Sequence, residues 1–180
     1  MGLAERLLRD ARKGRESAFL RLFDDHHLPL VRFAYRLTGS AADAEDIVQE
    51  CFLALLRPEC NFDPARTAVR TYLFGAVRNQ ALKRLRRQEG GELPETPDFR
   101  TPEVAALRDE VGRAVADAIG QLPETQREIL LLAHYEQLSL AEIAEITELE
   151  TTAVKSRLQR ARATLKETLA AYAPKTERTI

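Results

Sequence analysis

Residue types that build metal and redox centres are scarce in this chain of 180 residues, which has two cysteines and three histidines. Cys51 and Cys60 lack the paired C-x-x-C spacing, and His26, His27 and His134 form no ligand pattern with them. We therefore expect no metal site and no disulfide framework, with Cys51 as a buried thiol and the histidines at the surface. The sequence also has no P-loop, no dinucleotide-binding glycine motif and no grouping of nucleophile, base and orienting residue. These absences argue against an enzyme and against a bound cofactor.

Long apolar runs are missing as well. No stretch approaches the roughly 20 residues that span a bilayer, and the N-terminal segment MGLAERLLRDARKGRE carries charges where a signal peptide is apolar. We expect a cytoplasmic protein that does not insert into membranes. No segment alternates cleanly between apolar and polar residues, whereas helical spacing recurs along the chain, so the sequence predicts an all-α fold.

Charge is nearly balanced in total, with a formal net charge of −1, but it is unevenly distributed. Residues 64–88 carry seven basic side chains and no acidic one, and residues 151–166 carry five basic side chains and no acidic one. Residues 89–103, between them, hold five acids and one arginine. Because a phosphate backbone responds to the local field of one face, this segregation indicates a nucleic-acid partner despite the net charge.

The acidic segment also predicts a domain boundary. Two glycines and three prolines between residues 90 and 102 break helices and leave little apolar material for a core. We therefore expect two small helical domains joined by an acidic flexible linker. The predicted segments are a first domain, the linker, a helix-turn-helix domain and a tail, at residues 1–88, 89–110, 111–173 and 174–180.

In the first domain, residues 16–26 have a helical apolar stripe, Pro29 restarts the pattern in a second helix, and Gly39 ends that helix. Ser40 is a suitable N-cap for the next helix, which runs from residue 41 to about residue 56. One face of that helix is polar and largely acidic, and is either a solvated surface or a docking surface for a basic partner. Its members are Asp43, Asp46, Gln49 and Glu50.

The basic segment predicts a helix that begins at Asp63-Pro64, an N-cap followed by a proline in the first turn. At 100° per residue, one sector of about 60° on this helix is polar. It contains Tyr72, Asn79, Lys83 and Arg86. Such a ridge is often only a solvated surface, and Tyr72 and Phe74 are often core residues. Alternating cations and aromatic rings nevertheless suit single-stranded nucleic acid, which offers phosphates and unstacked bases.

The second domain contains a helix-turn-helix candidate, because two helical segments are separated by a short turn at residues 147–150. The second helix has an inner stripe of Val154, Leu158, Ala161 and Leu165. An ordinary amphipathic helix explains that stripe equally well, but not the lack of acids on the outer face. Such a face suits the major groove. Its members are Thr152, Ser156, Gln159 and Arg160, with Lys155 and Arg162 on the shoulder.

Four motifs occur in a fixed order around the acidic linker: DAEDIVQECFLAL (43–55), YLFGAVRNQALKRLRR (72–87), LPETQREILLLAHYEQLSLAEIAEI (122–146) and VKSRLQRAR (154–162). Together they resemble the extracytoplasmic-function group of bacterial sigma factors, the promoter-recognition subunits of RNA polymerase in the sigma-70 family. The resemblance implies two helical DNA-binding domains and no catalysis. It also implies core RNA polymerase and promoter DNA as partners, and commonly an anti-sigma factor that restrains the free protein.

The resemblance assigns roles to positions of this chain. The helix at 43–55 would dock on the polymerase clamp through Asp43, Asp46, Gln49 and Glu50. The helix at 72–87, with the loop before it, would open the minus-ten element and hold its non-template strand. Capture of an extruded base offsets the few kcal/mol of lost stacking and pairing. The strand-holding residues would be Tyr72, Asn79, Lys83, Arg86 and Arg87.

The helix at 154–162 would enter the major groove of the minus-thirty-five element. Its DNA-binding residues would be Thr152, Lys155, Ser156, Gln159, Arg160 and Arg162.

Two positions depart from the family pattern, since relatives commonly have glycine where this chain has Glu148 and Thr152. A residue other than glycine with positive φ costs about 1 kcal/mol.

The main alternative function is a stand-alone regulator, in which residues 111–170 bind duplex DNA and the first domain senses a ligand or partner. A third possibility is a helical scaffold that binds a sigma factor rather than being one.

Overall fold

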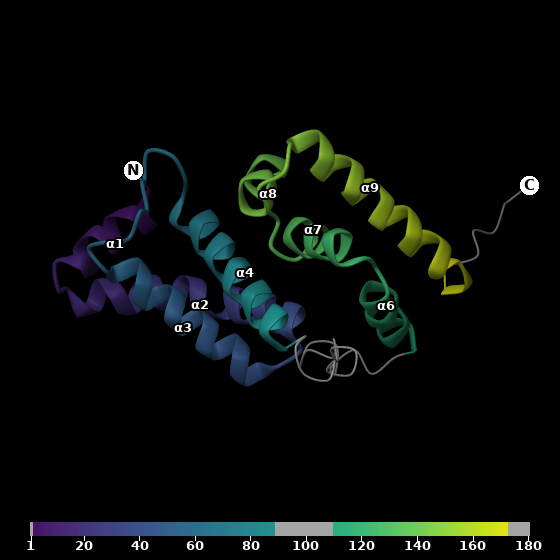
Figure 1. The fold of residues 1–180 in the computed structure, drawn as a ribbon, viewed down its shortest axis with the longest axis horizontal. Coiled ribbons are helices and arrows are strands. Elements are labelled where there is room, and N and C mark those ends of the chain that lie inside the picture. Colours follow the sequence, from purple (N-terminus) through teal and green to yellow (C-terminus); the bar gives the residue numbers. More distant parts are fainter. Residues whose placement is uncertain (1, 89–109, 173–180) are drawn as a thin grey trace, which may run out of the picture.

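The computed structural model describes residues 2–88 and 110–172, and all regular elements in these two stretches are helical, as predicted. Helices α1–α4 form one bundle and α6–α9 form a second (Figure 1). The predicted linker, up to residue 109, and the predicted tail lie outside the described residues. The elements are α1 (Leu3–Arg12), α2 (Glu16–Thr38), α3 (Ala41–Leu56), α4 (Val69–Gln88), α6 (Glu110–Gly120), α7 (Glu124–His134), α8 (Leu140–Thr147), α9 (Thr151–Thr168) and the 3-10 turn η1 (Ala170–Tyr172).

The sequence predicts two helices on either side of Pro29, but α2 is one continuous helix that contains this proline. A proline inside a helix removes one backbone hydrogen bond and costs about 3 kcal/mol. Leu22 before the proline and Phe33 after it are both fully buried in one core, so packing on both sides outweighs that cost. The predicted end of the helix is confirmed, because Gly39 adopts the left-handed conformation with φ 71°.

Helix α3 begins as predicted. The Ser40 hydroxyl accepts a hydrogen bond from the backbone N–H of Asp43 at 3.2 Å, which satisfies one of the unpaired donors of the first turn. The predicted thiol in this helix is also confirmed as buried, since Cys51 is 4 % exposed.

Helix α4 begins at Val69, five residues later than the sequence predicts. Asp63 does act as a local acceptor, but its carboxylate binds the N–H of Ala65 at 2.9 Å and closes a turn. Phe62 and Val69 are buried on either side of this turn, so the segment is held as a loop between two core contacts.

Two aromatic side chains form the centre of the first bundle. Phe33 of α2 and Phe74 of α4 meet edge to face, with ring centroids 5.4 Å apart, and both are at most 1 % exposed. Phe74 is therefore a core residue and not a platform for stacking bases.

The histidines depart partly from the predicted surface positions. His134 is exposed, but His26 and His27 are half-buried. The His27 ring stacks on Phe23 at 4.4 Å between centroids, and its Nε2 lies 2.8 Å from a carboxylate oxygen of Glu45. A stacked ring with a carboxylate partner stabilises the packing of α2 against α3.

The predicted helix-turn-helix is confirmed as α8 and α9. Ser139 and Glu142 form a reciprocal capping box at the start of α8, with the Ser139 N–H donating to the Glu142 carboxylate at 2.8 Å. Glu148 ends the helix in the left-handed conformation, with φ 56° and ψ 37°. Glu148 is one of the two positions at which the sequence departs from the family pattern. Glycine would adopt its left-handed conformation without strain.

The two bundles are in contact. Helix α4 lies beside α8, with the rest of the first bundle on its other side (Figure 1). The N-terminal half of α4, which carries Arg70 and Thr71, makes part of this contact.

Candidate nucleic-acid interface

The basic ridge of α4 is open to solvent at four of its five predicted positions. Asn79, Lys83, Arg86 and Arg87 are all exposed. Their side chains come from consecutive turns of one helix, and residues 64–88 contain no acid to oppose them. The ridge can therefore follow a phosphate backbone over about two turns of helix.

Tyr72, the fifth predicted position, is half-buried against the loop before α4 rather than fully open. Its hydroxyl lies 3.3 Å from the Cys60 sulfur, and its ring packs edge to face on Phe62 with centroids 5.3 Å apart. Burial and the Cys60 hydrogen bond raise the pKa of Tyr72 to about 12. Sequence reasoning missed Phe62, whose one signal is an aromatic residue within an otherwise polar loop.

The outer face of α9 is also open. Thr152, Lys155, Gln159 and Arg160 are exposed, whereas Ser156 is half-buried and its hydroxyl accepts a hydrogen bond from Arg160 at 3.1 Å. The predicted inner stripe is confirmed at Val154, Leu158 and Ala161, which are buried, and Leu165 is half-buried. One face is therefore fixed against α7 and α8, and the other presents hydrogen-bonding groups to solvent.

The polar face of α3 is divided by an arginine that sequence reasoning did not single out. Arg84 of α4 binds Asp43 at 2.6 Å and lies 3.5 Å from a carboxylate oxygen of Asp46. Gln49 and Glu50, further along the same helix, are exposed. Of the four predicted polymerase-contacting residues, Asp43 is half-buried and already paired within the chain, whereas the other three are exposed.

Buried ion pairs join the two bundles. The Arg78 guanidinium of α4 forms a bidentate ion pair with the Glu128 carboxylate of α7. Its Nε faces Oε1, and its Nη2 lies 3.3 Å from Oε2. Burial raises the pKa of Glu128, and the Arg78 hydrogen bonds oppose that shift. The side chains of Arg78 and Glu128 are 16 % and 4 % exposed, so the two charges are largely removed from water together.

Glu136, in the loop between α7 and α8, is the centre of a second set of contacts. Its carbonyl oxygen accepts a hydrogen bond from Arg70 at 2.6 Å, and its carboxylate lies 3.9 Å from Arg36. Arg36 also stacks over the Tyr135 ring at 4.3 Å from the centroid. Arginines of α2 and α4 thus both contact the same loop of the second bundle.

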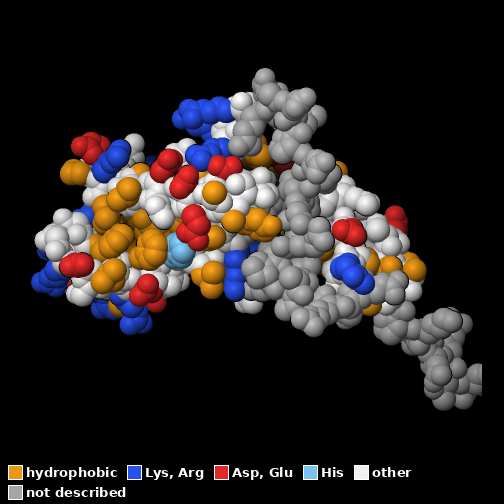
Figure 2. Space-filling model, turned by 90° about the horizontal axis from the view of Figure 1, so that it is seen from below, with side chains coloured by type: hydrophobic (Ala, Val, Ile, Leu, Met, Phe, Trp, Pro, Cys, Tyr) orange, Lys and Arg blue, Asp and Glu red, His pale blue; other side chains and the backbone are white. Residues whose placement is uncertain are grey.

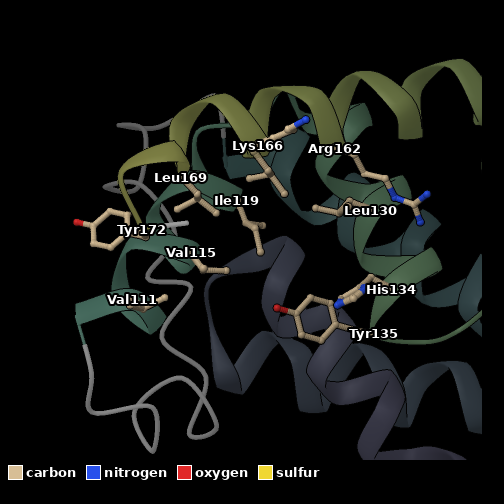
Figure 3. A pocket seen from close by; sticks show the side chains of 11 residues that line it. Val111, Val115, Ile119, Leu130, His134, Tyr135, Arg162, Lys166, Leu169 and Tyr172 are labelled. Carbon is tan, nitrogen blue, oxygen red and sulfur yellow. The ribbon is translucent and has the colours of Figure 1, made fainter. Parts of the chain in front are cut away.

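Apolar surface is exposed on both bundles. Figure 2 shows hydrophobic side chains gathered on one face of the first bundle beside a histidine. Leu20, Leu28 and Leu53 are each at least half exposed. On the second bundle, a groove of about 570 Å³ lies between α6, α7 and α9 (Figure 3). Val115, Ile119 and Leu130 contribute to its apolar lining, and Arg162 lies along it, so Arg162 adjoins both the groove and the outer face of α9.

The described residues contain no helix that combines the length and the apolar character needed to cross a bilayer. Nor do residues 2–88 and 110–172 bring together three or more histidine, cysteine or acidic side chains in an arrangement that could bind a metal ion.

Comparison with known proteins places both bundles in one family. Residues 22–90 match sigma-70 region 2, and residues 112–165 match sigma-70 region 4. The chain is 40 % identical over 163 residues to the ECF RNA polymerase sigma factor SigL of Mycobacterium tuberculosis, covering 86 % of this chain and 90 % of SigL. It is 27 % identical over 182 residues to the ECF RNA polymerase sigma factor SigW of Bacillus subtilis, covering 93 % of this chain and 97 % of SigW.

A solved structure agrees with these matches. The structure of CnrH in complex with the cytosolic domain of CnrY superposes with a TM-score of 0.72 and 29 % identity, covering 96 % of this chain and all of the CnrH chain. The two sigma-70 regions occur in the family's order, the fold is that of a relative, and the identity to SigL extends over most of both chains. The chain therefore belongs to the extracytoplasmic-function group of the sigma-70 family and is an RNA polymerase sigma factor.

Proposed function

We propose that this sigma factor holds the melted minus-ten strand on the α4 ridge and reads the minus-thirty-five duplex with the outer face of α9. The observation that carries the proposal is the exposure of two acid-free basic surfaces on separate helices. Single-stranded DNA is held by charge and stacking, whereas duplex DNA is read by side chains on a helix in the major groove. The α4 ridge supplies the charge, with the half-buried ring of Tyr72 on the same helix, and the outer face of α9 supplies side chains that can reach base edges.

We assign the strand-holding role to Asn79, Lys83, Arg86 and Arg87. Tyr72 would act differently, because its ring lines the loop that carries Cys60 and Phe62 and so adjoins the place where an extruded base would be captured. The reading role belongs to Thr152, Lys155, Ser156, Gln159, Arg160 and Arg162. Gln159 and Arg160 offer donors to base edges, and Lys155 and Arg162 offer charge to phosphates.

Core polymerase would bind the polar face of α3. Asp46, Gln49 and Glu50 are exposed there, and Asp43 contributes through its pair with Arg84. We further propose that the protein works in the cytoplasm, has no catalytic activity of its own, and divides into domains at residues 1–88 and 111–173. An anti-sigma factor is an expected partner, because the exposed leucines of the first bundle and the groove of the second offer apolar surface that such a partner would cover.

Run-off transcription tests the proposal. Templates come from sequencing DNA crosslinked to the protein in its native cell, and purified protein is added to core polymerase. We expect initiation at a small set of promoters, and loss of initiation with Lys155→Ala combined with Arg160→Ala. Protein that binds these DNAs yet never directs initiation would instead be a stand-alone regulator, and the proposal would fail.

A further inference from the structure

The contact between the bundles is built around α4, the same helix that carries the strand-binding ridge. Arg78 pairs with Glu128, and Arg70 binds the backbone carbonyl of Glu136. The Thr71 hydroxyl lies 3.3 Å from a carboxylate oxygen of Glu142. Glutamates from α7, from the loop after it and from α8 thus engage one side of α4.

This arrangement cannot span a promoter. The positions −10 and −35, on which the two elements are centred, lie about 25 base pairs apart, which is roughly 85 Å of duplex at 3.4 Å per base pair. Helix α9 has 18 residues, so it extends only about 27 Å, and α8 at its start is in direct contact with α4. The two DNA-binding surfaces must therefore move apart before both elements are bound.

We propose that the Arg78–Glu128 pair, supported by the Glu136 and Glu142 contacts, is an autoinhibitory latch that holds the free sigma factor closed. The inference rests on the proposed function, because only a protein that binds both elements at once needs to open. The latch blocks simultaneous binding and not each surface alone, since Asn79, Lys83, Gln159 and Arg160 are exposed in the closed form. Opening releases Arg78 next to Asn79, where its charge adds to the ridge.

The chemistry of the contact suits a reversible latch. A buried ion pair gains little over the two separated, hydrated ions, because desolvation offsets much of the attraction. Removing one of the two charged side chains is costly while the bundles remain closed, because the remaining buried charge then has no partner. The same pair therefore holds the closed form and allows a partner that binds the separated domains to open it.

Distance measurement between spin labels tests the latch. Asp24→Cys in α2 and Glu167→Cys in α9 place labels at exposed sites on the two bundles, in a Cys60→Ser background that leaves Cys51 as a buried thiol. We expect one short distance for the free protein. Glu128→Arg, which places a cation against Arg78, should shift the distribution to long distances. Glu145→Arg, the same charge reversal at an exposed position of α8, should leave the distance short.

A charge swap controls for misfolding. Arg78→Glu should open the protein from the other side, and Arg78→Glu combined with Glu128→Arg should restore the short distance. A free protein that shows long distances without substitution, or a Glu128→Arg protein that stays short, would overturn the latch. Failure of the swap to close the protein would also overturn it.

Polymerase binding separates this inference from the proposed function. Core polymerase that holds the two domains at the spacing of the promoter elements binds only the open form. If the open form is at most about one tenth of the free protein, Glu128→Arg should therefore tighten the apparent affinity for core polymerase by about tenfold or more. It should also retain run-off transcription. An unchanged affinity, or loss of transcription in Glu128→Arg alone, would contradict the latch. If the unsubstituted protein directs no run-off transcription, the proposed function is refuted, whatever the spin-label distances show.

Discussion

The arginines of α4 have different roles although they lie on one helix. Arg84 is paired with acids of α3, Arg78 is paired with Glu128 of α7, and Arg86 is exposed. A paired guanidinium contributes little field to the surface, so the ridge attracts phosphate mainly through Lys83, Arg86 and Arg87. The number of basic residues in the segment therefore overstates the positive charge that the ridge presents in the free protein.

Substitutions should separate charge from base recognition. In holoenzyme, Lys83→Ala should weaken promoter binding on all sequences alike and reduce the slope of log affinity against log salt by about one. Gln159→Ala should relax preference at one upstream position, by about 1–3 kcal/mol between bases. Lys13→Ala, an exposed lysine outside both surfaces, is the control. Uniform weakening on every sequence by Gln159→Ala would remove that residue from the reading face.

The two cysteines should differ in reactivity. Burial, with a smaller effect of Glu50, raises the pKa of Cys51 to about 12, and the thiolate is the reactive form. In native protein at pH 8, a thiol reagent should therefore modify Cys60 alone, and unfolding should add a second equivalent. For stability, a raised thiol pKa means that the contribution of Cys51 is present below about pH 9 and is lost as pH rises toward 12. Rapid modification of both thiols in the native protein would contradict this account.

Among the secondary-structure elements, the turn between α8 and α9 carries local strain that a substitution can relieve. Glu148 has φ 56°, a conformation that costs a residue with a side chain about 1–2 kcal/mol. Glycine avoids that cost but is more disordered in the unfolded chain, so Glu148→Gly should stabilise the fold by about 0.5–1 kcal/mol. Denaturant unfolding measures the change.

Glu145→Gly is the matched control, because it removes the same charge from an exposed position inside α8. Glycine in a helix interior costs about 1 kcal/mol relative to alanine, so this variant should be destabilised. If both variants shift stability in the same direction, the charge and not the backbone conformation controls the turn.

The capping box of α8 should make stability depend on pH. Hydrogen bonds from the Ser139 hydroxyl and N–H hold the pKa of Glu142 below its ordinary value, with a smaller effect of Thr71. Because the folded-state pKa is lowered, this stabilisation is present above the unfolded pKa of about 4.3 and is lost as pH falls through the folded value.

Ser139→Ala should therefore cost about 1 kcal/mol at pH 7, and clearly less at pH 3.5. Thermal unfolding at the two pH values measures the difference. Ser156→Ala, whose hydroxyl accepts from Arg160 and has no carboxylate partner, should show no such pH dependence. A Ser139→Ala cost that is equal at both pH values would show that the carboxylate does not take part.

Most helices follow from local sequence, and the exceptions have a common cause. Ser40, Gly39 and the apolar spacing of α9 predict their elements correctly, because each depends on neighbours within four residues. The segments at Pro29 and at Asp63-Pro64 were mispredicted because burial of residues on both sides decided the backbone there. Proline and N-cap preferences are weak beside the packing of a core.

For the whole molecule, sequence reasoning identified both exposed surfaces but not the contact between the bundles. The ion pair at its centre joins Arg78 and Glu128, which are 50 residues apart. A glutamate in an amphipathic helix has no periodicity that marks it as a partner for a distant arginine. Pairs of this kind depend on the packing of the two bundles, which local patterns do not encode.

Site-specific crosslinking in holoenzyme tests the division of labour between the two surfaces most directly. A photoreactive side chain replaces Asn79 in one protein and Gln159 in another, and each is irradiated with core polymerase on a promoter. The account predicts crosslinks from position 79 to the non-template strand of the minus-ten element and from position 159 to the minus-thirty-five duplex. Crosslinks from both positions to the same element, or from neither position to DNA in a transcribing complex, would contradict it.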